Sequence, residues 1–63
     1  MTNWAVHIKF ATARGAEEAF DREVRADGAK AATEAVERQL ARSRRGYRIR
    51  QIVTREIRAE EAA

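Results

Sequence analysis

Residues 4–10, Trp-Ala-Val-His-Ile-Lys-Phe, alternate large apolar side chains with small or polar ones at a strict period of two. This period is typical of a strand that is buried on one face, and β-branched and aromatic residues favour strands. The alternation ends at residues 12–15, Thr-Ala-Arg-Gly, where the glycine can adopt a positive φ angle and close a turn. We therefore predict a central strand whose Trp4 and Phe10 fill the core.

The segment 16–26 fits two structures. Its apolar residues have a helical spacing, but Phe20, Val24 and Ala26 also share one face of a strand. A helix here would leave only two strands, and a stable sheet usually needs at least three. We therefore favour a strand that ends at Asp27, whose carboxylate is placed to accept hydrogen bonds from the first amides of the next helix.

Residues 29–44 predict an α-helix. Alanine is the best intrinsic helix former, and the apolar residues that recur at helical spacing are Ala29, Ala32, Val36 and Leu40. The arginines at the end of this segment complement the negative end of the helix dipole. Gly46 follows at a position suited to a C-terminal cap.

Residues 47–58 predict the last strand. A simple alternation puts Tyr47, Ile49, Val53 and Ile57 on one face, with Tyr47 at the edge of the core, and Arg48, Arg50, Thr54, Glu56 and Arg58 on the other. Ile52 does not fit this alternation, which indicates either a bulge near Arg50 and Gln51 or an apolar spot on the outer face. The last residues, 59–63, form a short acidic tail that we expect to fray.

These elements predict the α+β class with a ββαβ order. A right-handed helical crossover makes the last strand parallel to the second, and the first strand then fits between them. The result is a three-stranded antiparallel sheet of order 2-1-3 with one helix on one face and the other face open. A chain of 63 residues allows one compact domain, spanning residues 1–63.

Composition excludes several classes of function. The chain has no cysteine and one histidine, which removes disulfide scaffolds, zinc fingers and thiol chemistry. No plausible triad forms around His7, so we expect a protein that is not an enzyme and needs no cofactor. No apolar run is long enough for a membrane helix and no export signal is present, so we expect a cytoplasmic protein without a membrane partner.

Positive charge is concentrated in residues 38–58, which hold eight arginines and one acid, Glu56. Arginine suits paired hydrogen bonds to phosphate or carboxylate, although a GC-rich genome produces the same bias. The predicted partner-binding surface consists of His7, Lys9, Arg48, Arg50 and Arg58 on the open sheet and Arg44 and Arg45 at the helix end. The alternative is a solvated charged surface that acidic residues partly neutralise.

Asp21 and Glu23 share one face of the second predicted strand. Two carboxylates in this spacing can bind a hard cation. Charge pairing with Arg48, Arg50 or Arg58 across the sheet is the favoured interpretation.

Two families are similar to this chain. Residues 20–26 (FDREVRA), the following helix and residues 50–57 (RQIVTREI) resemble archaeal ribosomal protein LX, which implies a basic ββαβ domain packed on ribosomal RNA. The size, the basic balance and the strand-strand-helix-strand plan also resemble small phage-encoded inhibitors of type I CRISPR surveillance complexes. That resemblance implies a non-catalytic inhibitor that binds the complex, also called Cascade, and blocks its capture of target DNA.

Three functions follow from these observations, in order of preference. The first is the anti-CRISPR inhibitor, and the second is a ribosome-associated or other small domain that binds RNA or DNA, including non-specific nucleic acid. The third is a structural homodimer formed through edge strands, because both outer strands of a 2-1-3 sheet have an unpaired edge. A monomer is expected in the first two cases.

Overall fold

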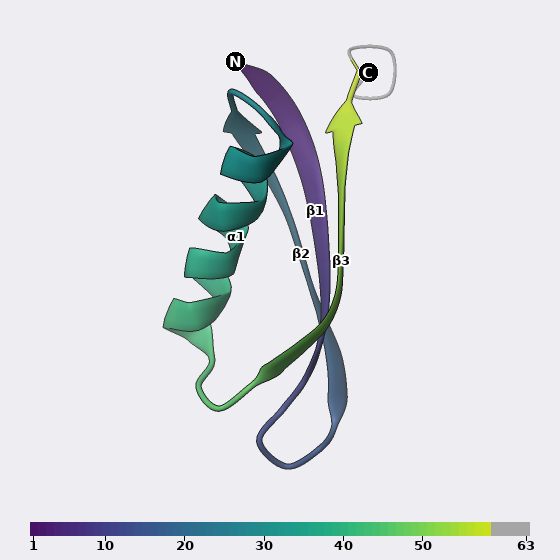
Figure 1. Ribbon diagram of the computed structural model, residues 1–63, viewed down its shortest axis with the longest axis vertical. Coiled ribbons are helices and arrows are strands. Elements are labelled where there is room, and N and C mark those ends of the chain that lie inside the picture. Colours follow the sequence, from purple (N-terminus) through teal and green to yellow (C-terminus); the bar gives the residue numbers. More distant parts are fainter. Residues whose placement is uncertain (59–63) are drawn as a thin grey trace.

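A computed structural model of the chain describes residues 1–58. Its elements are β1 (Thr2–Ala11), β2 (Glu17–Ala26), α1 (Ala29–Ser43) and β3 (Arg48–Ile57) (Figure 1). The strands form one sheet of order β2-β1-β3, in which β1 pairs antiparallel with both neighbours. The predicted ββαβ fold, its strand order and the strand in residues 16–26 are therefore confirmed. The predicted fraying of residues 59–63 lies outside the described residues.

The core lies between one face of the sheet and α1 (Figure 1). Its buried residues are Val6, Ile8, Phe10, Ala26, Ala32, Val36 and Leu40. Every second residue of β1 and every fourth residue of α1 contribute, as their periods require. Among the described residues, no helix combines the length and the apolar character needed to cross a membrane.

Two aromatic side chains border this core. The half-buried Trp4 donates a hydrogen bond from Nε1 to the carbonyl oxygen of Ala26 at 3.2 Å, which ties β1 to the end of β2. The half-buried Tyr47 meets Phe10 edge to face, with ring centroids 5.9 Å apart. Phe10 is thus in the core as predicted and Tyr47 is at its edge, whereas Trp4 lies at the border of the core.

A bulge interrupts the pairing of β1 with β3. Phe10 is opposite Ile49, but the preceding residue, Lys9, is opposite Gln51. Arg50 is therefore the extra residue of β3, which confirms the first of the two sequence-based explanations of Ile52, a bulge near Arg50 and Gln51. Because side chains alternate at a period of two, one extra residue reverses the face of every residue that follows it.

This reversal corrects the predicted faces of β3. Ile52 and Thr54 lie opposite Ile8 and Val6 and point toward the helix, where the hydroxyl of Thr54 is 2.7 Å from that of Thr33 in α1. Val53, which is 47% exposed, belongs to the open face instead of the core. Ile57 joins Val53 on the open face, and Glu56 lies on the helix side, opposite Trp4.

The ends of α1 also differ from the prediction. The N-cap residue is Gly28, without a side-chain hydrogen bond, so Asp27 does not cap the helix. At the other end the C-cap residue is Arg44, whose backbone N–H donates to the carbonyl of Leu40 at 2.9 Å. Gly46 has a φ angle of +68° and therefore turns the chain two residues beyond the cap.

Replacing neighbouring residues of β3 tests the reversal of faces. Ile52→Ala should lower the free energy of unfolding by about 1–3 kcal/mol, because it removes methyl groups packed against the core. Val53→Ala should change it by less than about 0.5 kcal/mol, because that side chain lies on the open face. Urea unfolding followed by circular dichroism measures both changes. A larger loss from Val53→Ala would contradict the bulge.

Candidate functional site

Two connecting segments meet at one end of the molecule. The loop between β1 and β2 and the turn between α1 and β3 lie at the same end (Figure 1). They are close enough that a Cβ atom added to Gly46 would lie 3.3 Å from the Cβ atom of Ala13. The first loop is closed by hydrogen bonds between Thr12 and both Gly15 and Ala16. These turns place residues from both segments side by side.

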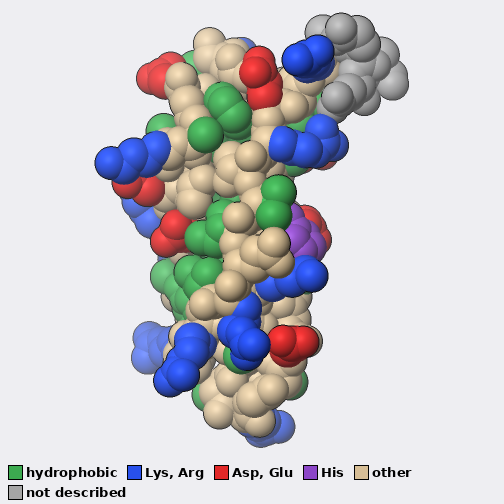
Figure 2. All heavy atoms as spheres, turned by 45° about the vertical axis from the view of Figure 1, so that its right-hand side comes forward, with side chains coloured by type: hydrophobic (Ala, Val, Ile, Leu, Met, Phe, Trp, Pro, Cys, Tyr) green, Lys and Arg blue, Asp and Glu red, His purple; other side chains and the backbone are tan. Residues whose placement is uncertain are grey.

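This end carries most of the basic residues that the sequence singles out. We call it the basic end, and it consists of Lys9, Arg14, Arg44, Arg45, Arg48 and Arg50. All of these residues are exposed. The bulge contributes Arg50 to the basic end, because this extra residue is near the start of β3. Figure 2 shows basic side chains gathered at the corresponding lower end of the molecule, with little acidic surface among them.

One arginine of the basic end is paired with an acid. Arg44 Nη2 lies 2.9 Å from Oε1 of Glu18, near the start of β2. Both side chains are well exposed to solvent, so this ion pair contributes at most about 1 kcal/mol to stability. Within residues 1–58, Arg45, Arg48 and Arg50 form no ion pair with an acid. Their guanidinium groups are available to an anionic partner.

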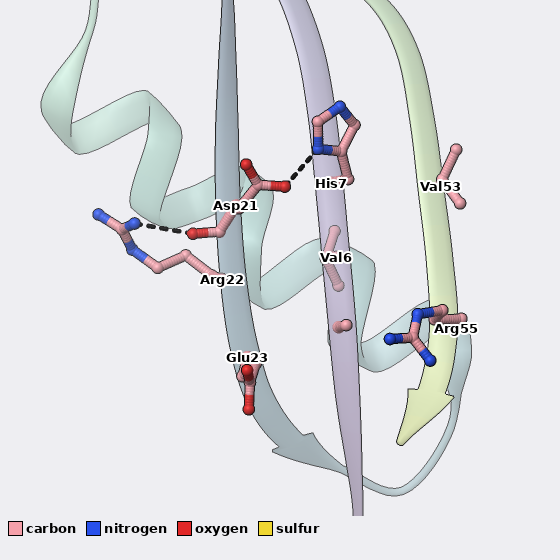
Figure 3. A pocket seen from close by; sticks show the side chains of 8 residues that line it. Val6, His7, Asp21, Arg22, Glu23, Val53 and Arg55 are labelled. Atoms are coloured by element: carbon pink, nitrogen blue, oxygen red, sulfur yellow. Dashed lines mark hydrogen bonds and ion pairs between the residues drawn. The ribbon is translucent and has the colours of Figure 1, made fainter. Parts of the chain in front are cut away.

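Two predicted site residues lie outside the basic end. His7 is in the middle of β1 and donates a hydrogen bond from Nδ1 to the carboxylate of Asp21 on β2 (Figure 3). Arg58 follows β3 at its far end, about 30 Å from Arg48 at roughly 3.3 Å per strand residue. The seven predicted residues therefore do not form one continuous surface.

The open face of the sheet has a different character. A shallow hollow of about 480 Å³ lies over Ala5 and His7, between Asp21 and Glu23 of β2 and two residues of β3, Val53 and Arg55. Figure 3 shows these side chains on the side of the sheet away from α1. Ala5 has a small side chain in the central strand, which leaves room for the hollow. On the β2 side the hollow is therefore lined by two acids and by Arg22, and on the β3 side it is lined by Val53 and Arg55.

Most of the polar groups outside the basic end are engaged within the fold or are not grouped to hold a metal ion. Residues 1–58 contain no group of three or more histidine, cysteine or carboxylate side chains placed to hold a metal ion. Asp21 is engaged with His7 instead of with an arginine across the sheet, which corrects the expected pairing. The hydroxyl of Ser43 donates to the carbonyl of Gln39 within the helix. The most distinctive chemical feature is therefore the cluster of guanidinium groups.

Sequence reasoning missed several contacts that depend on tertiary structure. Glu18 of β2 forms an ion pair with Arg44 at the end of α1. Arg22 lies over the ring of Phe20, with its guanidinium carbon 4.2 Å from the ring centroid, and so covers the edge of the core. The alternation of Phe20 with polar residues predicts the strand, but the partner of Glu18 lies in α1 and no local pattern identifies it.

Comparisons with protein-family models, curated proteins and solved structures found no match to this chain. The resemblances to ribosomal protein LX and to the CRISPR inhibitors therefore stand as sequence-based expectations. The basic end and the open face are the features from which a function can be argued.

Glycine substitutions test the geometry of the basic end. Gly15 and Gly46 both have positive φ angles, but only Gly46 has a close neighbour for an added Cβ atom. Gly15→Ala should destabilise the fold by about 1 kcal/mol through backbone strain alone. Gly46→Ala should cost more, because the side chain of Ala13 must also shift. Thermal unfolding measures both, and equal losses would contradict the close approach of the two segments.

Proposed function

We propose that this protein is a non-catalytic binding protein whose basic end docks on a nucleoprotein. In its most specific form it is a phage-encoded inhibitor of a type I CRISPR surveillance complex. The observation that supports this proposal is the clustering of Arg45, Arg48 and Arg50, which form no ion pair with an acid among the described residues, beside Arg44.

The chemistry of arginine suits such a partner. Each guanidinium group can donate two parallel hydrogen bonds to one phosphate or one carboxylate. The arginines of the basic end come from a helix terminus, a turn and a bulged strand. They are therefore clustered at one end of the molecule and do not lie along one recognition helix. Such a surface reads backbone charge in preference to base sequence.

The proposed function predicts that the protein blocks the capture of target DNA. A surveillance complex holds its guide RNA and its target DNA in a positively charged channel. A small basic protein competes by occupying phosphates of the guide or acidic residues near the channel, and it needs no chemical step. The proposed inhibitor therefore acts stoichiometrically, through its arginines.

A target-capture assay tests this function. Purified protein is titrated into a type I surveillance complex, and binding of labelled target DNA is measured by gel shift. We expect the wild-type protein to block capture and the double variant Arg45→Glu, Arg50→Glu to lose at least about tenfold in potency, because two phosphate or carboxylate contacts become repulsive. The matched control is Lys30→Glu, Arg58→Glu, which makes the same change in net charge at the other end of the molecule and should remain active.

Direct binding to labelled RNA and DNA over a salt series accompanies this assay. Failure of the wild-type protein to block capture would overturn the inhibitor proposal. If the protein then binds RNA with an affinity that falls steeply with salt, the ribosome-associated alternative gains support. Equal activity of both double variants would show that the basic end is not the docking surface.

A further inference from the structure

The open face of the sheet carries charge of opposite sign on its two outer strands. On β2 the charged residues that point away from α1 are Glu17, Asp21 and Glu23, which form an acidic column, and Arg25, which lies beyond this column near the end of the strand. On β3 the corresponding charged residues are Arg48 and Arg55. All of these side chains are exposed. An acidic column and a basic column therefore flank β1 on the same face.

The two columns are in register with each other through β1. Glu23 and Arg55 both pair with Ala5. Glu17 and Arg48 both pair with Ala11, further along the same strand. Glu23 and Glu17 thus each lie at the same height along the sheet as an arginine, one strand to either side of the centre, whereas Asp21 lies at the height of Val53.

We propose that the open face binds the open face of a second copy of this chain. In the proposed dimer the two-fold axis lies between the two sheets and runs parallel to β1. Rotation about this axis leaves the position of every residue along the strand direction unchanged. It brings β2 of one copy over β3 of the other. The acidic column of one copy then lies over the basic column of the other, so that Glu23 faces Arg55 and Glu17 faces Arg48, and each pair occurs twice.

The other two-fold arrangement of facing sheets is unfavourable. An axis that runs across the strands would place β2 over β2 and β3 over β3. The acids of the two β2 strands would then share one column, in which only Arg25 has the opposite sign, and the arginines of the two β3 strands would share the other. Such juxtapositions of like charge are costly at an interface. The charge pattern therefore selects one of the two arrangements.

Packing at the centre of the face agrees with the selected arrangement. Facing sheets lie about 10 Å apart, and the small Ala5 side chain allows this approach. Val53, which is 47% exposed, lies beside the hollow and would be covered by the second copy. Lys9 faces its own copy across the axis, and its long stem can turn toward Glu17 or Asp21 of the opposite sheet.

The size of the face is suited to a dimer of modest affinity. It runs along the longest dimension of the molecule, which is 39 Å. A stable interface typically buries about 800 Å² on each partner. Because this face is polar apart from its centre, we expect a dissociation constant in roughly the micromolar range. Packed sheets also cross at about 30°, so facing residues move apart with distance from the centre of the interface. The pairs of Glu23 with Arg55, which lie nearest the centre, therefore contribute most.

Charge reversal tests this dimer. In the homodimer of Glu23→Arg the new arginine faces Arg55, and in that of Arg55→Glu the new glutamate faces Glu23. We therefore expect each single variant to lose at least tenfold in self-association, measured by sedimentation equilibrium up to about 1 mM. In an equimolar mixture of the two variants every facing pair is again of opposite sign, so the mixture should associate as a heterodimer.

Recovery of association in the mixture distinguishes contact between copies from contact within one chain. Within each variant chain, residues 23 and 55 still carry like charges, so a contact between them in the same chain would not recover on mixing. The circular dichroism spectrum verifies that each variant is folded. A wild-type protein that stays monomeric at 1 mM would overturn the proposal. So would a wild-type dimer that both single variants preserve, because that result indicates association through the strand edges.

Discussion

The packing of β1 against α1 is the contact on which the rest of the structure depends. Val6, Ile8 and Phe10 are all but inaccessible to solvent, as are Val36 and Leu40 of the helix. Burial of each such side chain contributes roughly 1.5–3 kcal/mol, far more than an exposed ion pair such as that of Arg44 with Glu18. The charged residues are therefore placed by this core and do little to create it.

One-sided packing has a direct effect on how the charges are distributed. Because one helix covers one face, the odd-numbered residues of β1 and their neighbours on β2 and β3 remain in contact with solvent. Both connections that carry arginines lie at one end of the sheet, so positive charge accumulates there (Figure 1). The open face, in contrast, carries three acids on β2 and two arginines on β3, with Arg25 as the one basic residue on β2. The same fold thus produces two surfaces of different chemistry. The basic end is suited to an anionic partner, and the open face is suited to the open face of a second copy.

Local pattern was sufficient to predict the fold, since the alternation in residues 4–10 and the helical spacing from Ala29 to Leu40 each report a buried face. The misplaced Ile52 indicated either a bulge near Arg50 and Gln51 or an apolar spot on the outer face, and the pairing with β1 shows that the bulge is the correct alternative. The faces beyond the bulge could not be obtained from the alternation alone, because Val53 and Ile57 are as apolar as Ile52 and only the pairing with β1 distinguishes them. The pairing of His7 with Asp21 and of Arg44 with Glu18 depends on which strands are neighbours and where the helix ends. The strand order places His7 and Asp21 on adjacent strands, but no sequence motif marks either pair.

The single inserted residue of β3 also has an evolutionary meaning. Because Arg50 is the unpaired residue, Ile49 lies opposite Phe10 and Gln51 lies opposite Lys9. A descendant that lost this codon would keep both pairings, with Ile52 toward the helix and Val53 on the open face, and would lose only the bulge and its guanidinium group. A lineage can therefore remove one positive charge from the basic end in one genetic event, without moving a core residue. Alignment of distant relatives would then require a gap at this position, and a comparison made without one would mistake conserved burial for divergence.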